Sequence, residues 1–291
     1  MRKFLILSII ILANLLNAQQ IKEKALLWEI SGNGIESPSY LFGTIHLACE
    51  GDVLMTDEIR TAFDKTNDLM LEIDMSDPKV LMEMMSIVNS NDGIALSEKL
   101  GEDLSNKVDK LLQEKKSSNL AMYENVNLQS FVMQMSLMGM NCQTAGGYDL
   151  LFLQEAMQNF KSIKGLESIQ TQIDLFMNQT EEESIEAIDY MVNNFSELEK
   201  QTSYIVELYK SKDIQGLYDE TKRSYDEAEY SMGGSFEDLL DNRNVNWIPV
   251  IEDQIKETST FIAFGAGHLA GDKGVINLLR EKGYTLTPIF K

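Results

Sequence analysis

The sequence predicts an α/β (α+β) fold: a mixed β-sheet core built from two strand-helix-strand units, each bearing a Gly-x-x-His motif, with a large helical insertion. Two runs of residues are the main basis for this prediction, YLFGTIHL at 40–47 and FIAFGAGHL at 261–269. In each run, strand-forming residues lead into Gly-x-x-His and Leu, and a helical pattern and a further strand pattern follow. A long stretch with helical periodicity separates the two units and predicts the insertion.

The N-terminal unit begins with two predicted strands, over 25–32 and 39–47, which are joined by a turn containing glycine and proline. Thr56 is suited to cap the start of a helix, since the apolar residues after it have helical spacing. The run LMLEID at 69–74 predicts a buried strand that completes the unit.

The C-terminal unit repeats this order. Residues 260–269 predict a strand and turn, 272–283 a helix closed by Gly283, and 284–290 a strand. We interpret the two units as an internal pseudo-repeat. Ligands bind at the carboxyl ends of the strands in open α/β sheets, so both motif histidines are expected at one edge of the sheet.

The insertion covers about 78–230. Helical periodicity is present in five of its segments, 78–89, 97–116, 127–140, 149–160 and 168–178. A short strand is predicted at 161–167, and 181–230 predicts a helical hairpin or pair that would cover the site. A last helix is expected over 236–257, with a kink or break at Pro249.

Residues 1–18 have the three-part pattern of a secretory signal: a basic pair at Arg2 and Lys3, an apolar stretch, and a small residue at Ala18. We therefore expect a secreted or periplasmic protein whose single domain covers 19–291. The apolar stretch is short for a membrane span. An uncleaved anchor is the alternative, and it would be the expected contact with a membrane.

Acidic residues predominate, with 46 Asp and Glu against 25 Lys and Arg, which gives a formal net charge of −21. A surface of this charge repels phosphate backbones. No nucleic-acid partner is therefore expected.

Cys49 and Cys142 are the two cysteines of the chain. In an exported protein an even count favours one disulfide, with two free thiols as the alternative. Neither cysteine has a second Cys or a His at the spacing of a zinc finger, so a thiolate zinc site is not expected.

His46 and His268 are the two histidines of the sequence, and each lies three residues after a glycine. Glycine allows a tight turn and close approach of a ligand, and a neutral imidazole offers a nitrogen to a metal or a proton. One such histidine would commonly be a hydrogen-bonded core residue. Two of them in matching contexts indicate a functional site.

A carboxylate should complete a site with two histidines, and Glu72 in LMLEID is the best candidate, with Asp74 in reserve. A buried carboxylate without a partner would destabilise the fold, so a buried Glu72 should have one. The alternative is that the strand lies at the edge of the sheet and that the side chain of Glu72 is solvated. Two imidazoles and one carboxylate form hydrolytic metal sites, in which the metal lowers the pKa of bound water. Zinc, cobalt, manganese and iron all accept these ligands.

Three further residues are candidates for chemistry: Glu167, Arg243 and Tyr148. Glu167 ends a predicted strand and could act as a general base at the same edge, or it could simply begin a helix. Arg243 could stabilise an oxyanion or bind a substrate carboxylate, or form an ordinary ion pair. Tyr148 follows two glycines and could donate a hydrogen bond to a developing anion, whereas Asp149 could cap the next helix.

The sequence resembles the TraB/GumN family, relatives of the animal TIKI proteins, in YLFGTIHL, LEID, GGYD, IKGLES, the Arg243-Asn244 pair and FGAGHLAGDKGVINLLREKGY. The resemblance covers roughly 25–290, and the paired Gly-x-x-His motifs are its most specific part. It implies an α/β core with helical additions, similar to the erythromycin-esterase and ChaN-like fold group. It also implies a secreted metallohydrolase, and specifically a peptidase, because the animal proteins are metal-dependent proteases that trim an extracellular signalling protein.

The resemblance also implies roles for individual residues. His46 and His268 match the motif histidines, and Glu72 matches their acidic partner. Glu167 and Arg243 also fall on family motif positions.

Our leading hypothesis is a metal-dependent hydrolase acting on a peptide or protein. The two histidines and Glu72 would hold one divalent metal (Mn, Co, Zn or Fe), and Glu167 would activate its water. Arg243 with Tyr148 would stabilise the tetrahedral intermediate. The alternatives are a non-catalytic haem- or metal-binding protein of the ChaN-like type, a metallo-esterase, and a protein whose site has lapsed.

Overall fold

The computed structural model describes residues 20–46, 48–88, 92–140, 145–228 and 234–290. The predicted signal segment 1–18 lies outside these ranges. Cys142 does so as well, and its disulfide with Cys49 therefore stays a prediction.

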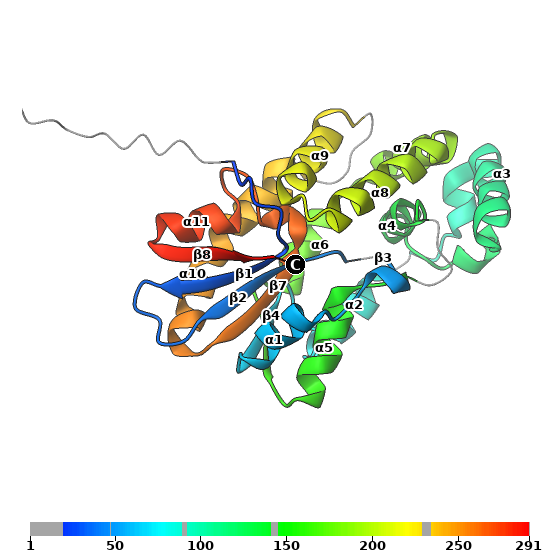
Figure 1. Ribbon diagram of the computed structural model, residues 1–291. Helices are drawn as coiled ribbons and strands as arrows, with labels where there is room; N and C mark the ends of the chain where they lie inside the picture. The colour runs from blue at the N-terminus through cyan, green and yellow to red at the C-terminus, as the bar shows by residue number, and fades with distance from the viewer. Residues whose placement is uncertain (1–19, 47, 89–91, 141–144, 229–233, 291) are drawn as a thin grey trace, which may run out of the picture.

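A six-stranded mixed sheet forms the centre of the molecule, in the order β6-β4-β7-β2-β1-β8 (Figure 1). The strands are β1 (Leu27–Gly32), β2 (Ser39–Thr44), β4 (Asp68–Leu71), β6 (Ser162–Gly165), β7 (Thr260–Gly265) and β8 (Tyr284–Ile289). The pairs β6-β4, β4-β7 and β7-β2 are parallel, whereas β1 is antiparallel to β2 and to β8. The predicted α/β fold with a mixed sheet and a helical insertion is thus confirmed.

The two strand-helix-strand units interlock in this sheet. Strand β7 of the C-terminal unit lies between β2 and β4, the strands of the N-terminal unit, and β8 lies beyond β1. The register pairs Thr44 with Gly265 and Gly43 with Phe264. The two motifs therefore end side by side on neighbouring parallel strands, but they are offset by one residue, so the pseudo-repeat is not strictly symmetric.

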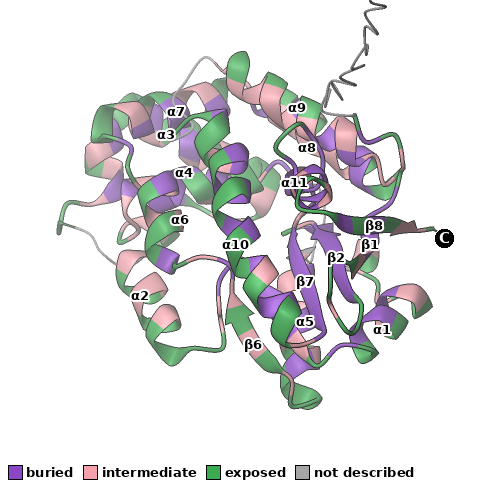
Figure 2. Cartoon of the chain, turned by 90° about the vertical axis from the view of Figure 1, so that its left-hand side faces the viewer, coloured by how far each residue is buried: buried purple, intermediate pink, exposed green. Residues whose placement is uncertain are grey.

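Helices cover both faces of the sheet. On one face α1 (Asp57–Asp64) and α5 (Tyr148–Gln158) contribute Phe63 and Phe152, which pack against Phe42 and Phe261 of the central strands. On the other face α10 (Asn242–Glu257) packs Trp247 against Phe264, with centroids 5.5 Å apart, and α11 (Val275–Glu281) contacts α10 and β8. Strands β2 and β7 are consequently buried along almost their whole length (Figure 2).

Part of the insertion forms a second lobe beside the sheet (Figure 1). Besides α5, the insertion contains helices α2 (Pro78–Val88), α3 (Leu96–Lys116), α4 (Leu128–Leu137), α6 (Ile169–Phe176), α7 (Glu181–Asn193), α8 (Phe195–Lys210) and α9 (Ile214–Asp226). The end of α8 and the start of α9 pack into the core of the sheet through Leu208, Ile214 and Leu217. Helices α3, α4 and α7 share a hydrophobic core of their own. Over 181–226 the chain makes three helices rather than the expected hairpin or pair, because Asp213 caps a further helix start.

Two local predictions need correction. The strand predicted at 69–74 ends at Leu71, so Glu72 follows the strand instead of lying in it. A kink or break was expected at Pro249, but the helix is not broken there and runs on from Asn242 to Glu257. The carbonyl of Val245, which would have accepted the missing N–H, belongs to a residue that is 47% exposed, so water can hydrate it.

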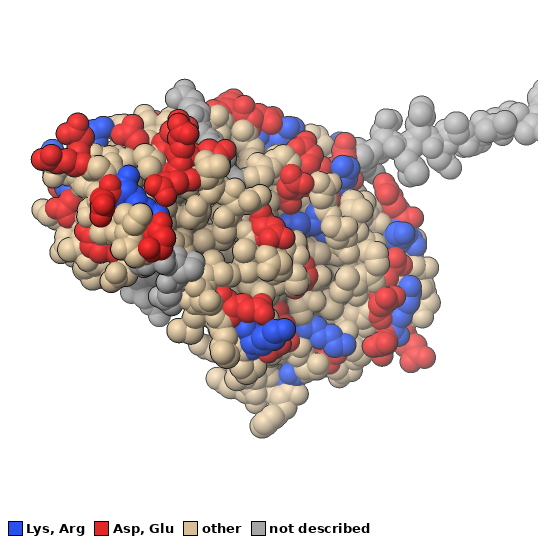
Figure 3. Space-filling model, turned by 180° about the vertical axis from the view of Figure 1, so that it is seen from behind, with Lys and Arg blue, Asp and Glu red and all other residues tan. Residues whose placement is uncertain are grey.

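On the face shown in Figure 3, acidic side chains gather on the helical lobe and along the opposite edge of the molecule. This distribution agrees with the formal charge of −21. Among the helices of the described ranges, none has the length and apolar character needed to cross a membrane.

The contact between the two motifs generates a prediction about stability. A Cβ added at Gly43 would lie 2.5 Å from Leu269 Cδ1 and 2.9 Å from Ala266 Cβ. We expect Gly43→Ala to lower the free energy of unfolding by about 1–3 kcal/mol, as overpacking does. Urea denaturation measures this change. Gly51→Ala is the matched control because a Cβ there meets open space, and equal midpoints for the two variants would contradict the expectation.

Candidate functional site

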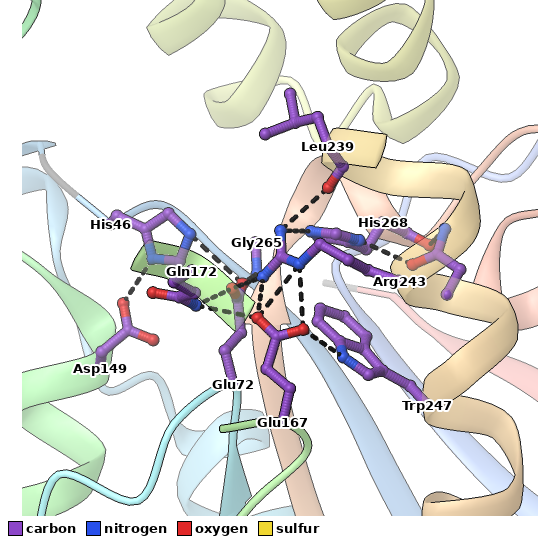
Figure 4. Close-up of polar contacts among 11 residues, drawn as sticks. His46, Glu72, Asp149, Glu167, Gln172, Leu239, Arg243, Trp247, Gly265 and His268 are labelled. Atoms are coloured by element: carbon purple, nitrogen blue, oxygen red, sulfur yellow. Dashed lines mark hydrogen bonds and ion pairs between the residues drawn. The ribbon is translucent and has the colours of Figure 1, made fainter. Parts of the chain in front are cut away.

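The candidate residues gather where the parallel strands end. His46 lies two residues after β2, Glu72 follows β4 directly, and Glu167 lies two residues after β6. His268 belongs to the short helix η4 (Ala266–His268) that follows β7. Because neighbouring parallel strands end at one edge of the sheet, four distant segments deliver their side chains to one place (Figure 4).

Gly265 lies at the centre of this group. A Cβ at this position would be 3.0 Å from His46 Nε2, 3.4 Å from Glu72 Oε1 and 3.7 Å from His268 Cδ2. The backbone N–H of Gly265 donates to Glu72 Oε1 at 2.8 Å. Glycine thus leaves a small space between the two histidines and Glu72, which we call the Gly265 cradle.

Arg243, on the first turn of α10, lies against the cradle with every donor engaged. Its Nε donates to both oxygens of Glu167 at 3.1 Å, and its Nη2 donates to Glu167 Oε1 at 2.7 Å and to Glu72 Oε2 at 2.5 Å. Its Nη1 donates to the carbonyl of Leu239 at 2.9 Å and to His268 Nε2 at 3.2 Å. The helix is in a π-helical turn just before this residue, over Glu237–Asp241.

This geometry corrects the expected role of Arg243. A guanidinium has five N–H groups, and here all of them have acceptors, while the side chain is only 7% exposed. No donor is left for an oxyanion or a substrate carboxylate in this arrangement. Arg243 is the counter-ion of two buried carboxylates, which would otherwise be strongly destabilising.

The expected role of Glu167 also needs correction. Both of its oxygens accept hydrogen bonds from Arg243, and they also accept from Trp247 Nε1 at 2.9 Å and from Gln172 Nε2 at 3.1 Å. A carboxylate so fully engaged is poorly suited to take a proton from water. Glu167 instead positions Arg243.

Tyr148 is a core residue and not part of the charged network. Its hydroxyl accepts from the N–H of Leu54 and donates to the carbonyl of the same residue, both at 3.2 Å. Its ring packs against Phe42 and Phe152. The expectation that Tyr148 stabilises an intermediate is therefore corrected. Asp74, the reserve ligand, accepts hydrogen bonds from Ser76 in the turn after β4.

His268 is held as a neutral imidazole. Its Nδ1 lies 2.6 Å from Oδ1 of Asn244, an atom that only accepts, so the ring proton is on Nδ1 and the lone pair of Nε2 faces Arg243. Burial, with the nearby charge of Arg243, lowers the pKa of His268 to about 3. Its ring also stacks at 4.4 Å on Trp247.

His46 differs from His268 in almost every respect. Its side chain is 58% exposed, and its two ring nitrogens face carboxylates: Nδ1 is 3.0 Å from Asp149 Oδ2, and Nε2 is 3.3 Å from Glu72 Oε1. Loss of solvent around the ring acts to lower the pKa of His46, but the charge of Glu72 and the hydrogen bonds with both carboxylates raise that pKa well above 6.5.

Glu72 stays ionised for the corresponding reason. Burial by itself would raise the pKa of this carboxyl. The positive charges of the neighbouring His46 and Arg243 outweigh burial and hold the pKa well below 4.5.

Asp149 is a site residue that the sequence patterns missed, since it was expected at most to cap α5. Gly147 is the N-cap residue of α5, and a Cβ at this position would collide with the carbonyl of His46. Glycine therefore allows the start of α5, which carries Asp149, to approach the backbone at His46. The motif GGYD was a usable signal. Asn244, Trp247 and Gln172 were also missed, although Asn244 and Trp247 share the buried side of α10 with Arg243.

The donor set fits a divalent metal in its chemistry. Both histidines have Nδ1 on an oxygen acceptor, which is the usual state of metal-binding histidines. Nε2 faces Glu72 in His46 and Arg243 in His268. Across the ranges that the structure covers, however, no three His, Cys, Asp or Glu side chains stand ready to hold an ion. Arg243 Nη1 lies 3.2 Å from His268 Nε2 and would have to move away for that nitrogen to bind an ion.

Comparison with known proteins gives one match. Residues 26–288, nearly the whole chain, match the TraB/PrgY/gumN family. No curated protein and no solved structure matches the chain.

The buried network predicts a large cost for removing its cation. Arg243→Met leaves Glu72 and Glu167 without a counter-ion, and we expect a loss of about 3–5 kcal/mol in the free energy of unfolding, measured by urea denaturation. Arg60→Met is the control, because it breaks a similar bidentate pair with Glu155 at the surface and should change little. Similar losses in both variants would contradict a buried, mutually dependent network.

The two histidines predict opposite titrations in metal-free protein. By imidazole NMR, we expect His46 to lose its proton only well above pH 6.5, and His268 to remain neutral down to the pH of acid unfolding. Between pH about 6.5 and about 3 the unfolded chain binds a proton at His268 and the folded chain does not, so this residue lowers stability as pH falls. With two histidines in the chain, His268→Gln assigns both signals. A His268 signal that titrates near pH 6 would contradict its burial as a neutral ring.

Proposed function

The chain belongs to the TraB/PrgY/gumN family, and on that premise we propose that it is a metal-dependent hydrolase, specifically a peptidase, with His46, His268 and Glu72 as metal donors. One observation carries the proposal. The two histidines of the chain and a buried, ionised glutamate surround a single space above Gly265, although they come from three distant segments.

The protonation states of the donors support this assignment. Metal ligands must be deprotonated: a carboxylate and a neutral imidazole. Glu72 is ionised, and His268 is neutral with its lone pair on Nε2. His46 has to release a proton first, so uptake of a metal near neutral pH should liberate about one proton.

When bound, such a metal supplies polarisation of a water or carbonyl oxygen, which makes attack by water feasible at neutral pH. The chain's own residues prepare the place. Asp149 and Asn244 fix the ring orientation of the two histidines, and Arg243 keeps Glu72 ionised and in position. The substrate would approach from the side of His46, because this ring is exposed while Arg243 and His268 are buried.

Histidine nitrogen and carboxylate oxygen bind manganese, cobalt, zinc and iron alike, so the ligand types do not select one metal. Metal analysis of the protein would identify it. The peptide or protein substrate follows from the resemblance to metal-dependent proteases. The export pattern in residues 1–18 supports action in a secreted or periplasmic setting.

The proposal predicts that divalent metal binds at this site and is required for peptide cleavage. We expect wild-type protein to bind one ion by calorimetry with about one proton released, and His46→Ala, His268→Ala and Glu72→Gln to bind at least about 100-fold more weakly. Glu102→Gln, an exposed carboxylate on α3, is the control. A peptide-library digest should show cleavage with metal and none after chelation.

Two results would overturn the proposal. The shared site is wrong if a histidine variant binds metal as tightly as wild type. Tight binding of metal or haem without any cleavage or ester hydrolysis would instead favour a non-catalytic binder.

A further inference from the structure

Thr44, in the first Gly-x-x-His motif, carries a buried hydroxyl that nothing so far explains. The residue is 1% exposed, and its Oγ1 has no hydrogen-bond partner among the residues that the structure describes. An unpaired hydroxyl in the interior is destabilising, and most buried polar groups in native proteins are paired with protein or with water. A bound oxygen atom is the natural partner to look for.

The register of the sheet places this hydroxyl beside the Gly265 cradle. Thr44 is the last residue of β2 and pairs with Gly265 of β7. Paired residues of neighbouring strands share a face of the sheet, and the strands lie about 4.8 Å apart. A Cβ at position 265 would be 3.0 Å from His46 Nε2 and 3.4 Å from Glu72 Oε1. The side chain of Thr44 thus lies on the same face of the sheet as the cradle, one strand away from Gly265.

This face of the sheet is the one on which His46 is exposed. Phe42, two residues before Thr44 and therefore on the same face, packs its ring 4.9 Å from Tyr148 and 5.4 Å from Phe152 of α5. Asp149 of the same helix contacts His46. Thr44 therefore lies on the face of the sheet that carries α5 and Asp149, between Phe42 and His46 along the chain.

The second motif has Ala266 at the position that corresponds to Thr44, and the offset register explains why. Ala266 packs against Gly43, with 2.9 Å between its Cβ and a Cβ added at the glycine, and so leaves no room for a hydroxyl there. The two motifs are alike in sequence, but only Thr44 is paired across the sheet with Gly265.

We propose that Thr44 Oγ1 binds a water on the β2 side of the Gly265 cradle and that this water is the one that attacks the substrate. The second half of this proposal rests on the hydrolase function proposed above. In peptide hydrolysis at neutral pH, the oxygen of that water bonds to the carbonyl carbon and the C–N bond breaks. Both of its protons pass to the departing amine, and the products are a carboxylate and an ammonium group. Thr44 fixes the position of the attacking oxygen and neither gains nor loses a proton overall.

The test compares Thr44→Val with Thr44→Ser. Valine keeps the shape and removes the hydroxyl, so we expect kcat to fall about tenfold or more with KM unchanged, because one hydrogen bond to the reacting water is lost. Serine keeps the hydroxyl and should retain most of kcat. The unfolding midpoint of Thr44→Val should equal or exceed that of wild type, since no protein hydrogen bond is removed.

Thr260→Val is the matched control on the neighbouring strand. Thr260 is equally buried, but it lies at the opposite end of β7, where its Oγ1 accepts from Gln254 and donates to the carbonyl of Thr258. This variant should lower the unfolding midpoint and leave kcat unchanged. A loss of kcat in Thr44→Val and a loss of stability in Thr260→Val would distinguish a hydroxyl that binds water from one that stabilises the fold.

A crystal structure of the metal-free protein gives a readout that needs no substrate. An ordered water within hydrogen-bond distance of Thr44 Oγ1, absent from Thr44→Val, supports the binding half of the proposal even if the chain hydrolyses nothing. Absence of that water in the wild type overturns it. An unchanged kcat in Thr44→Val, or an equal loss in Thr44→Ser, overturns the catalytic half.

Discussion

The ion pairs that Arg243 makes with Glu72 and Glu167 are the constraint on which the rest of the site depends. They join three segments that are far apart in sequence, with separations of 171 and 76 residues. Two carboxylates buried at the end of a sheet need a cation, and Arg243 supplies it with all of its donors engaged. Together with His46, the same network keeps Glu72 ionised, and through the contact of Arg243 with Nε2 it sets the ring of His268.

This network divides the site into a closed and an open half. Arg243, Trp247 and His268 form the closed half on the α10 side, where stacking and burial hold every group in place. His46 and Asp149 form the open half on the α5 side. Glu72 belongs to both, since one oxygen faces Arg243 and the other faces His46.

The interlocked sheet explains how much of this could be predicted. Hydrophobic periodicity gave most strands and helices with small errors at their ends, because the pattern reports which face of an element is buried. It missed the third helix over 181–226. The insertion of β7 between β2 and β4 depends on contacts between strands some 200 residues apart, and no local pattern encodes them. That pairing also produces the one-residue offset between the motifs, so Gly43 lies against Ala266 whereas Gly265 lies beside the site residues. The two motifs are therefore similar in sequence but not equivalent in the structure.

The sequence by itself determined the fold class, the place of both Gly-x-x-His motifs at strand ends and the candidacy of His46, His268 and Glu72, because scarce polar residues in apolar patterns stand out locally. Only the tertiary structure decided that Arg243 and Glu167 are bound to each other, that Tyr148 belongs to the core, and that Asp149 reaches His46. Whether a polar side chain is free to act depends on which partners have already taken its donors and acceptors. Those partners are brought together only by folding.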